Sequence, residues 1–274
     1  MNDILTQIVA HKHEELTLQQ QAVSIDQLHE SCQQVLKRPT LSMKQSLASS
    51  LTGIISEFKR KSPSKGWIHQ DALPEKVAPA YEQAGAAALS VLTDEQFFGG
   101  RLRDICTIRP LVQIPILRKD FIINEYQLLQ ARIAGADAVL LIAACLTMEE
   151  CISLAEKAHE LGLEVLLEVH SPAELNYIVA KPDMLGVNNR NLGTFVTDVQ
   201  NSFKLAKALR SLVPQIDNAP LLVSESGISR PETILSLREA GFRGFLMGEA
   251  FMKASSPGNA LKQLIDNINP ALTL

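Results

Sequence analysis

The segment IPILRKDFIINEYQLLQARIAGADAVLLIA, residues 114–143, decides the fold. It opens with an apolar run (114–119), continues with a helical pattern that ends in glycine (125–135), and returns to an apolar run (138–143). Continuous apolar runs of this length suit parallel strands that are covered on both faces. Glycine is typical of the position just after a helix. The segment therefore predicts a strand–helix–strand unit with parallel strands.

The same alternation extends from Gly53 almost to the end of the chain. The predicted strands are 53–58, 86–91, 114–119, 138–143, 164–169, 184–189, 221–226 and 244–248. Helical patterns between them cover 75–85, 125–135, 147–162, 172–180, 201–212 and 231–241. Eight such runs without a Gly/Ser-rich linker predict an α/β fold, a (β/α)8 TIM barrel. A doubly wound sheet is the alternative, but no GxGxxG follows the first run.

The first 45 residues have a different, helical pattern. Ile4, Leu5, Ile8 and Val9 fall on one helical face, and a second helix is expected over 25–36. We therefore expect one TIM-barrel domain over residues 1–274. It would consist of an N-terminal helical extension (1–45) and the barrel (53–274).

Composition excludes several classes of protein. The 274 residues carry 26 basic and 30 acidic side chains, a net charge of −4, whereas nucleic-acid binders usually have a basic face. Apolar stretches are shorter than the roughly 20 residues that cross a bilayer, and no secretory signal pattern is present. The four cysteines form no CxxC pattern, which is typical of ordinary thiols. We expect a cytoplasmic protein with neither a nucleic-acid nor a membrane partner.

Polar residues directly follow six of the eight predicted strands. In TIM barrels the active site lies at these carboxyl ends. Glu57 and Lys59 are two residues apart and leave the strand on the same face, as do Asn188 and Arg190. The pattern predicts a site at the carboxyl-terminal mouth of the barrel.

Lys119 and Glu168 end two of these strands and are the acid–base candidates. In a dry barrel mouth we expect the pKa of a lysine to fall and that of a glutamate to rise, which suits proton transfer near neutrality. A structural ion pair is the alternative for both residues.

Ser226, Gly227 and Gly248 follow the last two strands, where barrels often bind phosphate with backbone N–H groups. A helix that starts there would add its positive N-terminus. The alternative is a plain strand-to-helix turn.

Histidines give no metal site. His11 and His13 diverge on their helix, which leaves Glu168 and His170 as the single metal-like pair. We expect neither metal nor cofactor.

Long strings of this sequence resemble one family. They are ILTQIVAHKHEE (4–15), ISEFKRKSPSKGWI (55–68), VLTDEQFFGG (91–100), PILRKDFIINEYQLLQARIAGADAVLLI (115–142), LLEVHSPAEL (166–175), LGVNNRNL (185–192), SESGI (224–228) and LMGEAFMK (246–253). Together they closely resemble indole-3-glycerol phosphate synthase, the TrpC family of tryptophan biosynthesis. The resemblance implies a metal-free lyase that closes 1-(2-carboxyphenylamino)-1-deoxyribulose 5-phosphate to indole-3-glycerol phosphate, with loss of CO2 and water.

The resemblance also implies roles for single residues. Lys119 would be the general acid and Glu168 the general base or a second acid. Glu57 and Asn188 would orient the sugar hydroxyls and the catalytic groups, while Lys59 would reach the phosphate and the catalytic carboxylate.

Binding residues follow in the same way. The anthranilate carboxylate would contact Arg190 and Ser62. The phosphate would be held, chiefly through backbone, by Ser226, Gly227, Gly248 and Glu249. The apolar slot between these anion sites would consist of Pro63, Phe98, Phe121, Leu140 and Leu192.

Other features depart from the family or stay open. Asn191 stands where an aspartate is expected, and Gly100 where a serine is common. The segment 59–66 contains Ser-Pro-Ser and glycine, which favours a mobile lid. We expect a monomer that can associate with other tryptophan-pathway enzymes. The alternatives are an aldolase with Lys119 as its Schiff-base nucleophile and a non-catalytic barrel that binds a phosphorylated ligand.

Overall fold

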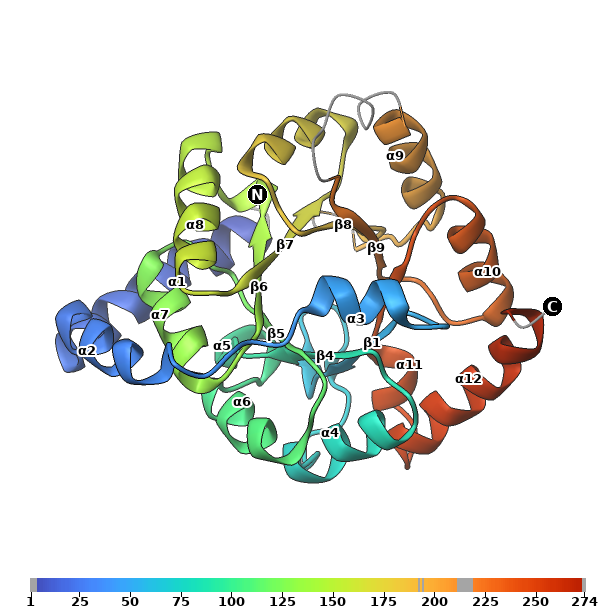
Figure 1. Ribbon diagram of the computed structural model, residues 1–274, viewed down its shortest axis with the longest axis horizontal. Helices are drawn as coiled ribbons and strands as arrows, with labels where there is room; N and C mark the ends of the chain where they lie inside the picture. The colour runs from blue at the N-terminus through green and yellow to red at the C-terminus, as the bar shows by residue number, and fades with distance from the viewer. Residues whose placement is uncertain (1–3, 192, 194, 211–218, 273–274) are drawn as a thin grey trace.

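The computed structural model describes residues 4–191, 193, 195–210 and 219–272. The central strands are β1 (Ile54–Phe58), β4 (Ala88–Leu92), β5 (Ile116–Lys119), β6 (Ala138–Ile142), β7 (Glu164–Val169), β8 (Met184–Asn188), β9 (Leu221–Glu225) and β10 (Gly244–Met247). They form a closed parallel barrel in the order β1-β10-β9-β8-β7-β6-β5-β4 (Figure 1). Each strand coincides with a predicted apolar run to within two residues, so the predicted TIM barrel is confirmed.

Sequence neighbours on a strand point to opposite sides of the barrel wall, because side chains alternate along a strand. Ile54 belongs to the apolar cluster outside the barrel, and Ile55 to the cluster that fills its interior. Ile116 and Leu117 divide in the same way. This alternation decides which residues at each strand end can reach the central axis.

Helices surround the barrel. They are α4 (Pro74–Gln83), α5 (Glu95–Phe98), α6 (Leu102–Ile108), α7 (Glu125–Ala134), α8 (Met148–Glu160), α9 (Gln200–Arg210), α10 (Pro231–Glu239), α11 (Glu249–Met252) and α12 (Pro257–Leu272). Local sequence fixes their ends: Asn124 forms a capping box with Gln127 at the start of α7, and Gly135 ends it in the left-handed region at φ 102°.

One predicted helix differs in type. Residues 172–180 form a 3-10 helix, η3 (Pro172–Ala180), instead of an α-helix. A 3-10 helix rises about 2.0 Å per residue against 1.5 Å in an α-helix, so nine residues span a longer path beside the barrel. Lys181 then ends η3 at φ 55°.

Three helices precede the barrel: α1 (Ile4–Ala22), α2 (Ile25–Val35) and α3 (Met43–Ser49). Helix α3 crosses the near end of the barrel in Figure 1, and its Met43 and Leu47 belong to the interior cluster. Helix α2 packs against α7. No helix in the described part of the chain is long and apolar enough to cross a membrane.

The segment after β1 forms a small antiparallel hairpin of β2 (Lys61–Ser62) and β3 (Gly66–Trp67). At its base the Arg60 guanidinium lies 2.6 Å from Asp104, an ion pair with α6. The hairpin therefore holds the lysine- and serine-rich loop at the mouth of the barrel.

Candidate active site

A layer of polar side chains closes the carboxyl end of the barrel interior. The last inward-facing positions of five strands carry Glu57, Lys119, Glu168, Asn188 and Glu225. Neighbouring strands bring them level, since Asn188 is in register with Glu225. The same alternation that fills the barrel with leucine lower down therefore gathers these charges at its mouth.

Every predicted site residue that the structure describes lines a single cavity at this mouth. These residues are Glu57, Lys59, Ser62, Pro63, Phe98, Lys119, Phe121, Leu140, Glu168, Asn188, Arg190, Ser226, Gly227, Gly248 and Glu249. Leu192 lies outside the described residues.

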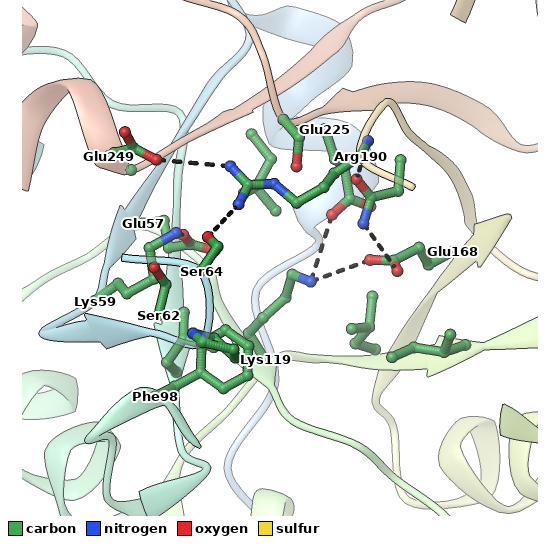
Figure 2. Close-up of a pocket in the computed structure, with 18 of the residues that line it drawn as sticks. Glu57, Lys59, Ser62, Ser64, Phe98, Lys119, Glu168, Arg190, Glu225 and Glu249 are labelled. Carbon is green, nitrogen blue, oxygen red and sulfur yellow. Dashed lines mark hydrogen bonds and ion pairs between the residues drawn. The ribbon is translucent and has the colours of Figure 1, made fainter. Parts of the chain in front are cut away.

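Lys119 is the centre of the charged network (Figure 2). Its Nζ lies 3.1 Å from Glu168 Oε2 and 3.5 Å from Glu225 Oε2. Burial would lower the pKa of Lys119, but Glu168, Glu225 and Glu57 outweigh it and raise that pKa. The expectation of a lowered lysine pKa was therefore wrong, because three carboxylates face this one ammonium group.

Glu168 is held in its ionised form. Burial would raise its pKa, yet Lys119 and His170 lower it, and Asn188 Nδ2 donates a hydrogen bond to Oε1 at 3.1 Å. The expected rise in the pKa of Glu168 was also wrong, since these partners stabilise the carboxylate.

His170 follows β7 directly and is one of those partners. Its Nε2 lies 3.3 Å from Glu168, and its Nδ1 lies 3.5 Å from Glu174. Burial would lower the pKa of His170, but the two carboxylates raise it to about 10. The histidine is thus a cationic neighbour of Glu168, a role that differs from the metal-like pairing considered from the sequence.

Glu225 is the main residue that the sequence analysis missed. Burial and the nearby carboxylates of Glu168 and Glu57 raise its pKa to about 8, against the opposing effect of Lys119. Its neighbour Glu168 is ionised, so the two carboxyl groups differ in protonation near neutrality. Such separation is typical of an acid–base pair.

A glycine in β8 could have indicated Glu225. A Cβ added to Gly186 would lie only 2.1 Å from Glu225 Oε1. Glycine inside a strand often marks the close approach of another group. Gly186 therefore makes the space that this carboxyl group occupies.

Glu57 and Lys59 form the predicted same-face pair. Lys59 Nζ lies 2.5 Å from Glu57 Oε1, and both side chains are mostly buried. The pairing at the end of β1 is confirmed.

Arg190 spans the mouth between two loops (Figure 2). Its Nη1 donates to Ser64 Oγ at 2.8 Å, and its Nη2 lies 3.6 Å from Glu249. Lys65 also pairs with Glu249. A guanidinium in this position can bind an anionic group that enters the cavity.

The glycine-rich turns have reasons beyond anion binding. Gly227 has a φ of +75°, and a Cβ at Gly248 would lie 2.7 Å from Glu57. Neither turn leads directly into a long helix, as the sequence analysis expected for phosphate binding. Helix α11 after Gly248 has only four residues, and α10 does not start until Pro231. Any phosphate grip here must come mainly from the turns themselves.

The two family departures are accommodated locally. A Cβ at Gly100 would lie 2.1 Å from Leu92 O, so this backbone could not accept serine without a shift. Asn191 Oδ1 accepts the N–H of Gly193 at 2.9 Å.

The N-terminal helix also contributes to the cavity, which the sequence analysis did not predict. Ile4, Leu5 and Ile8 line it together with the barrel residues. The helical period was the available signal, but such a face is equally typical of simple packing.

Comparisons with known proteins identify relatives over nearly the whole chain. Residues 5–264 match the family model described as indole-3-glycerol phosphate synthase. The chain is 61% identical to the indole-3-glycerol phosphate synthase of Bacteroides thetaiotaomicron, over 98% of this chain and all of the relative. It is 40% identical to that of an Azoarcus species, over 96% of this chain and 99% of the relative.

Solved structures support the fold alone. Thiamine phosphate pyrophosphorylase from Pyrococcus furiosus aligns with a TM-score of 0.58 at 17% identity, over 81% of this chain and 98% of that one. KGPDC from Streptococcus mutans aligns with a TM-score of 0.59 at 11% identity, over 81% of this chain and 99% of that one.

Proposed function

The chain belongs to the indole-3-glycerol phosphate synthase family, and we propose that it carries out the family reaction with Lys119 as general acid and Glu168 as general base. The reaction converts 1-(2-carboxyphenylamino)-1-deoxyribulose 5-phosphate into indole-3-glycerol phosphate, CO2 and water. It is a carbon–carbon lyase reaction of tryptophan biosynthesis.

One observation carries the proposal: a single ammonium group, Lys119, stands between Glu168 and Glu225 inside a cavity with apolar and glycine-rich sides. Phe98, Phe121 and Leu140 come from the β4, β5 and β6 side of the barrel. The Ser226–Gly227 and Gly248–Glu249 turns follow β9 and β10, on the opposite side of the ring of strands. An aromatic group and a phosphate at the two ends of one substrate fit this division.

Lys119 would protonate the ketone oxygen while the aromatic carbon that carries the carboxylate attacks the ketone carbon. Loss of CO2 follows ring closure. The new hydroxyl group then leaves as water with a proton from an acid, while a base removes a proton from the methylene carbon next to the nitrogen, which makes the new five-membered ring aromatic. Glu168 is in the unprotonated form that a base requires, because Lys119 and His170 lower its pKa.

The binding roles are those that the family resemblance implies, and these residues lie on the cavity wall. Arg190 and Ser62 would hold the anthranilate carboxylate, and Lys59 would approach the phosphate. Glu57 and Asn188 would orient the sugar hydroxyls.

The glycine-rich side would hold the phosphate. The phosphate would be bound, chiefly through backbone N–H groups, by the turns at Ser226, Gly227, Gly248 and Glu249.

A fluorescence assay of indole-3-glycerol phosphate formation tests the proposal. Glu168→Gln keeps the shape of the side chain and removes the base, so we expect a loss of about 10²–10⁴ in kcat. Glu160→Gln, a control at an exposed glutamate that pairs with Lys157 at the end of α8, should retain full activity. Full activity of the Glu168 variant would overturn the base assignment, and loss of wild-type activity with EDTA would overturn the metal-free mechanism.

We further propose that residues 1–274 act as one domain and that the protein is a cytoplasmic monomer able to associate with other tryptophan-pathway enzymes. Light scattering tests the monomer directly. A dimeric mass at micromolar concentration would contradict it.

A further inference from the structure

Helix α1 contains a lysine that the reaction does not use. Lys12 is fully buried, although lysine is almost never buried unless it is paired. It lies one helical turn after Ile8, which lines the cavity. Lys12 itself is not among the residues that line the cavity.

Three carboxylates face the Lys12 ammonium group. Glu15 of the same helix lies at 2.8 Å, and Asp94 and Asp120 of the barrel loops each lie at 3.1 Å. Burial would lower the pKa of Lys12, but Asp120, Asp94 and Glu15 outweigh that effect and raise it. The group is therefore a permanent cation that joins α1 to the barrel.

Both barrel partners belong to the apolar side of the active site. Asp94 caps α5, since its Oδ1 accepts the N–H of Phe97, and α5 ends in the cavity residue Phe98. Asp120 directly follows Lys119 and accepts the N–H of Phe121 at 2.9 Å.

Asp120 is itself rigidly held. Arg118 Nη2 lies 2.9 Å from its Oδ2, and Thr93 donates to the same oxygen at 2.6 Å. Burial would raise the pKa of Asp120, but Arg118 and Lys12 lower it to about 2. Lys12 therefore pairs with a carboxylate, Asp120, that Arg118 and Thr93 already hold in place.

We propose that Lys12 is a positioning residue for substrate binding: it docks α1 on Asp94 and Asp120 and so presents Ile4, Leu5 and Ile8 as a wall of the cavity. The wall joins the aromatic side formed by Phe98 and Phe121, whose ring centroids are 6.0 Å apart. The inference rests on the proposed placement of the substrate's aromatic end on that side.

An apolar wall contacts the substrate equally before and in the transition state. Removal of such uniform binding raises KM and leaves kcat nearly unchanged. A residue that acted only on folding would lower the amount of active enzyme without this split.

The experiment compares Lys12→Met and Lys12→Arg in the full chain, with Glu15→Gln as the matched control. Glu15 is a partner of Lys12 on the same helix, so its loss leaves the ties to the barrel intact. We expect Lys12→Met to raise KM about tenfold or more with kcat within about threefold, Lys12→Arg to restore part of the affinity, and Glu15→Gln to behave as wild type. A tenfold change corresponds to about 1.4 kcal/mol, which the withdrawal of three apolar side chains can account for.

A double-mutant cycle separates the wall from general destabilisation. Ile8→Ala should raise KM in the wild-type background and add little in the Lys12→Met background, because the wall is then already displaced. If Lys12→Met fails to fold, Leu5→Ala alone must still raise KM, since it leaves every Lys12 contact in place.

Unchanged KM in folded Lys12→Met, additive effects of the two substitutions, or wild-type KM in Leu5→Ala would each overturn the inference. Loss of kcat in Glu168→Gln tests the proposed function independently, so the two failures can be told apart.

Discussion

Lys12 is a fully buried lysine and Lys119 a mostly buried one at the same end of the barrel, and both are surrounded by carboxylates. Lys119 retains 15% of its side-chain exposure and lines the cavity, whereas Lys12 is sealed from solvent. Both pKa values are raised. The difference is access: a raised pKa marks a paired lysine, and only an opening to the cavity makes that lysine available to a substrate.

The largest expected effect is on catalysis at the accessible lysine. Lys119→Met should lower kcat by about 10²–10⁴, because the ketone oxygen loses its proton donor. Steady-state assays on folded protein measure this change. If the variant kept wild-type kcat, the cavity opening would not identify the acid, and the comparison between the two lysines would fail.

The sealed lysine should dominate stability instead. Lys12→Met leaves Asp94 and Asp120 buried without their shared cation, which typically costs about 3–5 kcal/mol. Urea unfolding of both methionine variants would measure the difference. If Lys119→Met lost as much unfolding free energy as Lys12→Met, or more, then contact with the cavity would not reduce the destabilisation caused by an unpaired carboxylate.

The third expected effect concerns pH and Glu225. Its pKa is raised from 4.5 to about 8, so the folded protein binds this proton more tightly than the unfolded chain does. The resulting stability is present below pH 4.5 and is lost as pH rises to about 8.

Glu225→Gln removes this dependence, since glutamine resembles the neutral acid. The variant should gain stability relative to wild type between about pH 5 and pH 8, as measured by thermal unfolding at several pH values. A constant difference across that range would contradict the raised pKa.

The smallest effect is expected at an exposed lysine. Lys65 pairs with Glu249 across the mouth, but 46% of its side chain is exposed. Exposed ion pairs contribute about 0–1 kcal/mol to stability. Lys65→Ala should therefore change the free energy of unfolding by less than about 1 kcal/mol. High salt should remove most of the difference.

The sequence predicts the barrel well because eight parallel strands leave eight apolar runs of regular length and spacing. It also predicts most of the candidate site, because charged residues such as Lys119 and Glu168 stand at the carboxyl ends of those runs. Whether a residue lies at a strand end can be predicted from the local sequence alone.

Contacts between distant segments are less visible. A lone lysine on an amphipathic helix resembles a solvated residue, and nothing near Lys12 in sequence indicates Asp94 or Asp120. The pKa values of Lys119 and Glu168 were mispredicted for a related reason. The burial of a residue at a strand end can be expected from the sequence. The number of charged groups around it, which decides the direction of the pKa shift here, depends on which strands are neighbours in the barrel.

Gly186 has a consequence for engineering. If backbone entropy alone decided, alanine at this strand position would stabilise the protein, because glycine loses more conformational freedom on folding. Here the added methyl group would displace the carboxyl group of Glu225. A search for thermostable variants that ranks substitutions by local propensity would therefore select a change that removes a proton-carrying group from the active site, and Gly186 should be held fixed in any such library.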